Sequence, residues 1–326
     1  MKKIIFYNII IISLLILSLE ILFRLFLNIS PQGVSPGIIN TERSGLVFNY
    51  SNIKKGKVFG SKVFTDKNGF RVSKNYTNNE KDENIFFIGG SVTFGNGIDQ
   101  SKTFTGILNE KFEKINIYNA GVIGSDIKNN YLILKEKVNK DNFKKVFISI
   151  TLDDLDQIKV QGKKSSQIIR SKSFLEKIKE NIIFSHMNNF VRSKSVVYVW
   201  IKGIILNAEQ GYYNYSLNAF KDKKNLEYLK KYLNLINEYN NKNGKKFIFV
   251  ILPYSKQTSS LGCTKSDLAE KIIEEYLEER SFVFLKIKKL FCEDQLTNKI
   301  FLKHDPAHLS YYGHNLLANY LKNYIE

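Results

Sequence analysis

Short apolar runs alternate with segments of helical periodicity from residue 85 to the C-terminus, and this alternation limits the possible folds more than any other feature. The runs are rich in Ile, Val and Phe, which favour strands. Strands separated by helices pair in parallel and are covered on both faces. The sequence therefore predicts an α/β fold, a three-layer α/β/α sandwich with a mostly parallel, flavodoxin-like sheet. The predicted strands cover residues 85–88, 115–119, 146–150, 247–252 and 282–287, and the predicted helices cover residues 104–112, 127–138, about 226–241, 268–279 and the chain from 310 onward.

The N-terminus is almost continuously apolar from Ile4 to Leu19. Glu20 and Arg24 follow at a spacing of four residues, which lets the two charges neutralise each other on one helix face. Crossing the hydrocarbon core takes about 20 residues. We therefore expect one transmembrane helix within an anchor of residues 1–29. A cleaved signal peptide is the alternative, but no small-residue cleavage site follows the apolar stretch.

The orientation of the anchor follows from Lys2 and Lys3, which favour a cytoplasmic N-terminus. The rest of the chain is then expected outside the cytoplasm. In an oxidising compartment Cys263 and Cys292 can close one disulfide, which would stabilise the fold by about 3 to 4 kcal/mol; two buried free thiols are equally compatible with the sequence. Two cysteines and four histidines without a CxxC motif do not predict a structural metal site.

The formal net charge of +18 comes mostly from lysines dispersed along the chain. A lysine-rich solvated surface is the simplest interpretation, and a polyanionic partner such as an anionic lipid surface or an acidic glycan comes second. A nucleic-acid partner is not expected, because the cations do not form blocks with spaced aromatic residues. Nothing in the sequence indicates the oligomeric state.

Three regions are predicted besides the anchor. Residues 30–84 form an irregular membrane-proximal extension with short extended pieces, and residues 85–326 form the main domain. An insertion at about 157–220 interrupts the alternation with helical segments and the cluster Tyr212, Tyr213 and Tyr215. We expect it to cap the site or to rest on the membrane, with most of its apolar residues packing on the core.

Candidate functional residues stand where predicted strands end, because ligands of such sheets bind at the carboxyl ends of the strands. A serine nucleophile needs a base, and the base needs an orienting carboxylate. Asp305 and His308, three residues apart before the last helix, suit these two roles. His304 is the rival base, whereas His186 lies in the insertion and His314 in the last helix. The residues at the strand ends are Ser91, Gly121, Gly124, Asp153 and Asp154.

Four short sequence blocks, taken in order, resemble those of a known family over about residues 64–326. They are Gly90-Ser91 after the first strand, the block from Asn119 to Gly124, an acidic turn after the third strand and Asp305-x-x-His308. Together they resemble the SGNH (GDSL-like) hydrolase superfamily. The charged N-terminal anchor, the NGFR at residues 68–71 and the Phe-Gly after the serine are similar to its membrane-anchored bacterial members.

This resemblance implies Ser91 as nucleophile, His308 as base and Asp305 as the residue that orients it. It also implies the N–H groups of Ser91 and Gly124 as oxyanion donors, without a metal or organic cofactor. The chain departs from the family at Asp153, where the family has an asparagine amide donor, since an ionised carboxylate only accepts hydrogen bonds.

Three explanations for this departure stay open. Asp153 is protonated, another side chain such as Asn119 replaces the amide, or the enzyme is slow or retired. A missing oxyanion donor costs about 10²- to 10³-fold in rate. Gly90, in the place of the family's Asp before the serine, is a lesser departure.

The expected function is that of a single-pass, membrane-anchored serine esterase of the bacterial cytoplasmic membrane with an extracytoplasmic catalytic domain. It would hydrolyse acyl esters, above all O-acetyl groups on envelope or exported glycans, through an acyl-serine intermediate. An O-acyltransferase using the same residues is one alternative. A catalytically retired domain that binds glycan or acts as a scaffold is the other.

Overall fold

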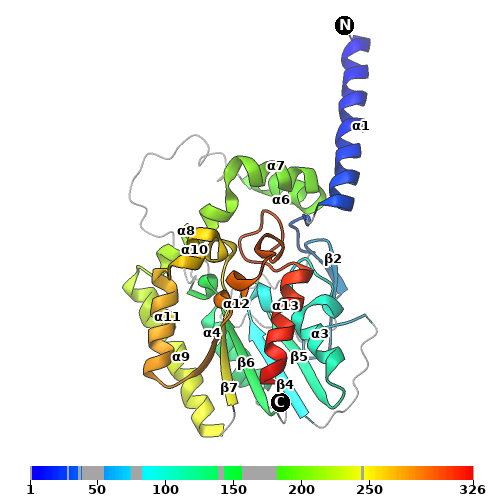
Figure 1. The fold of residues 1–326 in the computed structure, drawn as a ribbon. Helices are drawn as coiled ribbons and strands as arrows, with labels where there is room; N and C mark the ends of the chain where they lie inside the picture. Colours follow the sequence, from blue (N-terminus) through cyan, green and yellow to red (C-terminus); the bar gives the residue numbers. More distant parts are fainter. Residues whose placement is uncertain are drawn as a thin grey trace.

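The computed structural model describes residues 2–27, 29–35, 38, 55–74, 83–138, 143–155, 182–243 and 246–325. Its centre is an eight-stranded sheet with the order β1-β2-β3-β5-β4-β6-β7-β8 (Figure 1). The strands are β1 (Lys55–Val58), β2 (Ser61–Thr65), β3 (Arg71–Val72), β4 (Glu83–Gly89), β5 (Ile115–Gly121), β6 (Lys145–Ile150), β7 (Lys246–Ile251) and β8 (Val283–Lys286).

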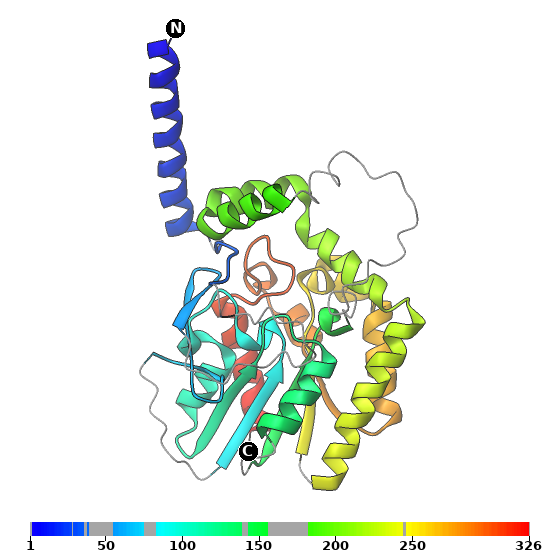
Figure 2. The same cartoon turned by 180° about the vertical axis from the view of Figure 1, so that it is seen from behind.

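Helices separate the strands of the main domain, as the alternation predicted. The α-helices are α1 (Lys2–Phe26), α2 (Ser91–Phe94), α3 (Phe104–Lys111), α4 (Ile127–Ile133), α6 (Ile182–Lys194), α7 (Val196–Leu206), α8 (Ala208–Ala219), α9 (Lys223–Asn243), α10 (Ser260–Thr264), α11 (Leu268–Glu279), α12 (Ile287–Glu293) and α13 (Tyr311–Leu321). Figures 1 and 2 show α3 and α13 over one face of the sheet and α4 and α9 over the other.

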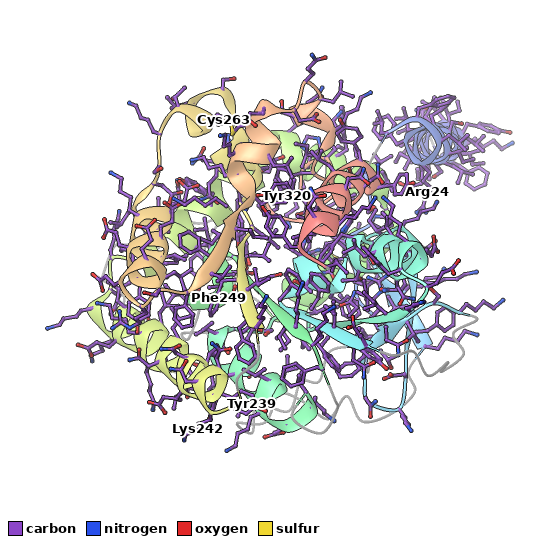
Figure 3. The ribbon with its side chains drawn as sticks, turned by 60° about the horizontal axis from the view of Figure 1, so that its bottom comes forward. Arg24, Tyr239, Lys242, Phe249, Cys263 and Tyr320 are labelled. Carbon is purple, nitrogen blue, oxygen red and sulfur yellow. A yellow bond between two sulfur atoms is a disulfide. The ribbon has the colours of Figure 1, made fainter. Side chains whose placement is uncertain are left out.

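Strands β4 to β8 are parallel, and in chain order they take the arrangement 2-1-3-4-5 of flavodoxin-like sheets. The predicted fold class is therefore confirmed. The middle strands are covered on both faces, so they read as continuous apolar runs rather than as alternating ones. Phe87 of β4 stacks on Phe147 of β6 with ring centroids 4.5 Å apart. Figure 3 shows Phe249 of β7 in the sheet between α9, which carries Tyr239, and α13, which carries Tyr320.

The region predicted as an extension, residues 30–84, adds three antiparallel strands to the sheet. The hairpin of β1 and β2 pairs with β3, and β3 joins β5 where Arg71 lies opposite Asn119. The sequence predicted only short extended pieces here, because each strand is too short to show a periodicity. The division of the chain into domains stays a prediction.

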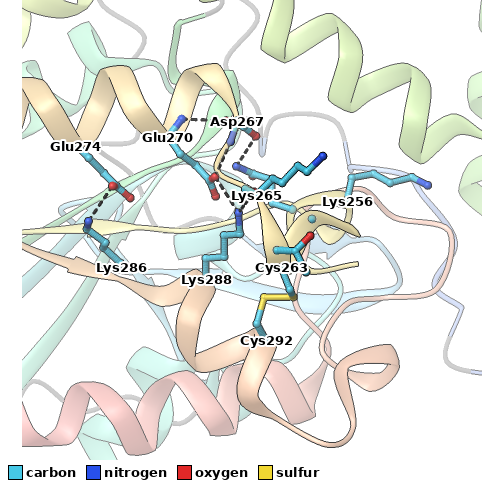
Figure 4. A network of polar contacts seen from close by, with 12 residues as sticks. Lys256, Cys263, Lys265, Asp267, Glu270, Glu274, Lys286, Lys288 and Cys292 are labelled. Atoms are coloured by element: carbon cyan, nitrogen blue, oxygen red, sulfur yellow. Dashed lines mark hydrogen bonds and ion pairs between the residues drawn. A yellow bond between two sulfur atoms is a disulfide. The ribbon is translucent and has the colours of Figure 1, made fainter. Parts of the chain in front are cut away.

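A disulfide joins Cys263 of α10 to Cys292 of α12. Beside it, the Asp267 side chain accepts the Glu270 N–H at the start of α11, and Lys288 Nζ lies 2.9 Å from Glu270 Oε2 (Figure 4). Of the two alternatives left by the sequence, the structure therefore has the disulfide.

Helix α1 projects from the rest of the molecule (Figures 1 and 2), and nearly all its apolar side chains are exposed. Among the described residues it is the one helix long and apolar enough to cross a membrane, and by length and composition it also fits a signal sequence. At its base lie α6 and α7, the described part of the predicted insertion together with α8. The first part of the predicted insertion, residues 157–181, lies outside the described residues.

Candidate active site

The candidate nucleophile stands at the carboxyl end of β4. The strand ends at Gly89, and Ser91 is the first residue of the short helix α2, which ends at Gly95 in the left-handed region. The N–H of a first helical residue has no carbonyl partner within its own helix. The turn from strand to helix therefore places Ser91 at the edge of the cavity that it lines, with a backbone N–H that its own helix does not use.

The structure brings Ser91, His308 and Asp305 into one hydrogen-bonded line. His308 Nε2 lies 2.8 Å from Ser91 Oγ, and His308 Nδ1 lies 2.9 Å from each carboxylate oxygen of Asp305. With a proton on Nδ1 donated to Asp305, the lone pair of Nε2 is free to accept the Ser91 proton. The arrangement can therefore activate a serine hydroxyl.

Asp305 is held by the turn that it begins. Its Oδ1 atom accepts the N–H groups of Ala307 at 3.0 Å and His308 at 2.8 Å. Burial raises the pKa of Asp305, but the His308 charge, the His308 hydrogen bonds and the Ala307 N–H outweigh it and lower the pKa below its usual value. Burial lowers the pKa of His308, but Asp305, together with the charge of Asp153, raises it above its usual value. The pair therefore favours an ionised carboxylate beside an imidazole that readily takes a proton.

Gly124 follows β5 and lines the same cavity as Ser91. Its φ of 75° lies in the left-handed region, which side chains with a Cβ atom rarely adopt. A glycine here therefore lets the loop after β5 turn its backbone toward the site. The predicted oxyanion residues Ser91 and Gly124 are thus brought to one cavity.

Asp153 also lines the cavity, at the carboxyl end of β6. Its Oδ1 atom accepts the Thr151 hydroxyl at 2.7 Å, and its Oδ2 atom lies 3.1 Å from the Tyr212 hydroxyl. Each carboxylate oxygen thus has a hydroxyl partner. The structure therefore has a carboxylate where the resemblance calls for an amide.

Asn119 does not replace the missing amide. Its Nδ2 atom lies within 3.3 Å of Phe94 O, Gln100 Oε1 and Thr105 Oγ1, and its Oδ1 atom accepts the Gly121 N–H. The side chain is fully buried in this network. The hypothesis that Asn119 provides the third oxyanion donor is wrong, because a side chain that makes four structural hydrogen bonds has no group left for a substrate.

Asn96 is the polar residue that the sequence analysis missed. Its Nδ2 atom lies 3.2 Å from His308 Nε2, its side chain lines the cavity, and 2% of the residue is exposed. Its Oδ1 atom is buried without a hydrogen-bond partner among the described residues. The only signal in the sequence is its place one turn after the serine, which alone does not separate it from other loop asparagines.

A buried arginine holds the loop that carries Asn96. The Arg71 guanidinium donates to the carbonyls of Phe94, Gly95 and Ile98, and it lies over the Phe94 ring. Burial lowers its pKa to about 9, so it remains a cation at neutral pH. Arg71 is the last residue of the NGFR motif, which thereby gains a physical role: it fixes residues 94–98 behind the nucleophile.

His304 and His314 make no hydrogen bond to Ser91 in the part of the chain that the structure describes. His314 is buried and accepts the Phe104 N–H at 3.2 Å, and burial with the charges of Arg71 and His308 lowers its pKa to about 3. His304, the rival base, lines the cavity with a φ of 60°. A Cβ atom on Gly203 of α7 would lie 2.4 Å from the His304 ring. His304 therefore acts as a wall against which α7 packs.

The cavity in front of Ser91 measures about 450 Å³. The main domain forms its floor, and residues from the extension and from α6 and α7 form its sides and roof. Phe59, at the tip of the β1–β2 hairpin, meets the His308 ring edge to face at 5.1 Å. No group of His, Cys, Asp or Glu that could hold a metal ion occurs among the described residues. The roof and side residues are Gln32, Val34, Phe59, Arg192, Val199, Lys202 and Gly203.

Comparison with known proteins gave similar solved structures only. No family model matches the chain, and no curated protein matches it. The chain is similar to a lipolytic protein of the G-D-S-L family from Veillonella parvula (14% identity, 74% of this chain and 98% of that one, TM-score 0.42). It is also similar to a lipase/acylhydrolase from Enterococcus faecalis (13%, 75% and 97%, TM-score 0.42). A third similar structure is an acetylxylan esterase from Geobacillus stearothermophilus (16%, 76% and 95%, TM-score 0.43).

Proposed function

We propose that this chain is a membrane-anchored serine esterase of the SGNH (GDSL-like) type. The observation that carries the proposal is the hydrogen-bonded line from Ser91 through His308 to Asp305, at the edge of a cavity where parallel strands end. The order of the sequence blocks supports the same assignment. Ser91 is the nucleophile and His308 is the general base and acid. Asp305 orients the His308 ring and stabilises its protonated form.

The reaction proceeds by acyl transfer in two halves. Ser91 Oγ attacks the ester carbonyl carbon while its proton passes to His308 Nε2. The tetrahedral intermediate collapses, the alkoxide leaves with the proton from Nε2, and an acyl-serine remains. A water molecule then attacks the acyl carbon, gives its proton to Nε2 and releases the carboxylic acid as Ser91 recovers its proton.

The oxyanion formed in each half needs donors that face the cavity. The N–H groups of Ser91 and Gly124 supply two of them. We assign the third to the Nδ2 amide of Asn96, which lies beside His308 Nε2, where the reacting oxygen atoms must pass. This assignment replaces the Asn119 hypothesis and leaves Asp153 with its two hydroxyl partners.

The membrane anchor is helix α1. Glu20 accepts the N–H groups of Val196 and Val197 at the start of α7, at 2.9 and 3.1 Å, and the Arg24 guanidinium donates to the Lys194 carbonyl. These contacts would be lost if α1 were removed as a signal peptide, so they favour a retained anchor. Lys2 and Lys3 give the N-in orientation in the cytoplasmic membrane of a bacterium, and the disulfide agrees with an extracytoplasmic domain.

The substrates are acyl esters, with O-acetyl groups on envelope or exported glycans as the class that the resemblance implies. An O-acyltransferase would use the same residues with a sugar hydroxyl in place of water. One observation favours a different kind of function: Asp153 adds a negative charge where an oxyanion develops, which suits a retired domain that binds glycan.

A serine-reactive fluorophosphonate probe tests the proposal on the full-length protein in detergent. We expect labelling of the wild type and complete loss of labelling in Ser91→Ala. Ser310→Ala is the matched control, because Ser310 caps α13 without facing the cavity and its loss should leave labelling intact. A folded wild-type protein that neither reacts nor hydrolyses an acyl ester would favour the binding domain.

A further inference from the structure

Helices α6 and α7 present two different faces. Their inner face forms the roof of the candidate active site, through Arg192 of α6 and through Val199, Lys202 and Gly203 of α7. Their outer face is apolar and exposed. The outer residues and their exposed fractions are Met187 (53%), Phe190 (66%), Ile201 (43%), Ile204 (56%) and Ile205 (72%).

The outer residues follow helical spacing. Ile201, Ile204 and Ile205 lie at positions i, i+3 and i+4 of α7, and Met187 and Phe190 lie at i and i+3 of α6, so each set forms one stripe. We call these five residues the roof patch. Charged or polar side chains normally occupy such a face in water. An apolar stripe over a polar site therefore points to an apolar partner.

The base of the anchor helix packs against α7, the helix that carries three of the five roof-patch residues. Phe23 of α1 meets Trp200 of α7 at 5.1 Å, and Ile29 packs with Val196 and Val199. Glu20 and Arg24 of α1 bond to the junction between α6 and α7. Figures 1 and 2 show α1 upright with α6 and α7 lying crosswise at its base. If α1 enters a membrane, a helix pair in this position lies at the surface of that membrane.

We infer that the roof patch rests on the outer surface of the bilayer that α1 crosses, with its five side chains in the boundary between headgroups and acyl chains. The inference rests on the membrane anchoring in the proposed function. Helix α7, with 11 residues, is too short to span the hydrocarbon core. Apolar side chains on one face and cations nearby suit an interfacial helix. The exposed Lys194, four residues after Phe190 in α6, suits anionic headgroups.

This placement deepens the assignment of substrate. The cavity lies directly beneath the roof, on the side of the molecule that meets the membrane. Its lining joins apolar groups such as Val34, Phe59 and Val199 to the polar atoms of the site. The substrate is then an ester carried by a molecule held at the membrane surface rather than one dissolved in bulk water.

Fluorescence quenching tests the position of the roof patch in the full-length protein reconstituted into vesicles of mixed neutral and anionic lipid. Both native cysteines are in the disulfide, so a cysteine introduced singly by Phe190→Cys, Ile204→Cys or Ile205→Cys can carry a polarity-sensitive dye. We expect stronger quenching by lipids spin-labelled near the headgroup than by lipids labelled near the chain end. Leu14→Cys in α1 is the control inside the bilayer, and Val283→Cys, an exposed apolar residue of β8 (58%), is the control in water.

Each pattern of quenching either supports or overturns the inference that the roof patch rests on the bilayer. Leu14 quenched and the roof positions as unquenched as Val283 would overturn the inference while leaving the anchor in place. Roof positions with blue-shifted emission but no quenching by lipid would assign the patch to a protein partner and overturn it as well. An unquenched Leu14 would overturn the anchoring and the inference with it. Fluorophosphonate labelling of the same samples reports separately on the serine chemistry.

A kinetic split tests the substrate assignment. The double variant Ile204→Ser/Ile205→Ser changes no residue that lines the cavity and should hydrolyse water-soluble p-nitrophenyl acetate at the wild-type rate. On a diacylglycerol ester in vesicles we expect it to lose about tenfold or more, since interfacial binding scales with buried apolar area. If the double variant kept the same fraction of the wild-type rate on both substrates, the result would contradict the assignment of a membrane-held substrate.

Discussion

The hydroxyl of Tyr212 lies 3.1 Å from Oδ2 of Asp153, so a residue of α8 contacts the carboxylate that stands where the resemblance calls for an amide. The contact joins the insertion to the edge of the site. It also leaves a negative charge near His308, whose pKa that charge helps to raise after the larger effects of burial and Asp305. Asp153 therefore influences the pKa of His308, and in the proposed mechanism it also lies near the oxyanion.

Replacing Asp153 by asparagine should speed the reaction. Asp153→Asn removes a charge that repels the oxyanion and adds an amide donor, and one oxyanion donor is worth about 10²-fold in kcat. Steady-state hydrolysis of p-nitrophenyl acetate measures the change. Tyr212→Phe, which removes one of the two hydroxyl partners of Asp153 but keeps the carboxylate, is the control and should not raise kcat. A slower Asp153→Asn enzyme would show that the carboxylate itself takes part in the reaction.

The rate should rise with pH through a pKa above the usual histidine value of about 6.5. His308 works as a base only when neutral, and the net effect of its surroundings raises its pKa, so activity is lost as the pH falls through that raised pKa. In Asp305→Asn the main charge that raises this pKa is absent. The acid limb of kcat/KM should then move to lower pH, with kcat lower by about 10⁴-fold.

The pH profile has its own internal check. If the acid limb of kcat/KM stayed at the same pH in Asp305→Asn, a group other than His308 would be responsible for it, since His308 would have lost its main charged neighbour. His304→Gln serves as the matched variant. It removes the rival base, and its profile should keep the wild-type limb.

The amide of Asn96 should matter for the transition state rather than for folding. Asn96→Ala removes the donor beside His308 Nε2 and should lower kcat by about 10²- to 10³-fold with little change in KM. Asn119→Ala is the contrast, because its buried amide serves the structure and its loss should lower the melting temperature. Thermal unfolding and kcat measured on both variants separate the two roles. A normal kcat in Asn96→Ala would show that Asn96 is not an oxyanion donor.

Arg71 should contribute strongly to stability. Arg71→Met would remove the guanidinium donor from three interior carbonyl groups and leave that of Ile98 without the charged partner it has now, so we expect the free energy of unfolding to fall by about 3 kcal/mol or more. Urea unfolding followed by circular dichroism measures this. Lys144→Met removes an exposed ion pair with Glu83 and should cost no more than about 1 kcal/mol. Similar losses in the two variants would contradict a special role for the buried guanidinium.

Much of the fold could be predicted from the sequence because the strands of the main domain are covered on both faces and so read as apolar runs. The predicted strand at residues 146–150 is observed as Lys145–Ile150, and the predicted helix at 268–279 as Leu268–Glu279. The strands of the extension were harder to see. Strand β3 has only two residues, and it forms because Arg71 pairs with Asn119, a contact distant in sequence.

The residues of the site also divide into those that the sequence could predict and one that it could not. Ser91, Asp305 and His308 stood at strand ends or in a short motif, so topology alone gathered them. Asn96 reaches His308 only because the loop from 94 to 98 folds back over a buried guanidinium. No local pattern encodes that fold-back, since it depends on a side chain more than twenty residues earlier in the chain.

The carboxylate of Glu20 caps the start of α7, so the anchor and the roof are fastened at one point. A helix whose apolar length exceeds the thickness of its bilayer responds by tilting. Such a tilt would turn α7 with it, and Gly203 would carry the movement to the ring of His304 in the cavity wall. If α1 crosses a bilayer as we propose, the thickness of the surrounding lipid would therefore alter the geometry of the site. A series of vesicles of graded acyl length would reveal this as a change in kcat/KM without any change in the protein.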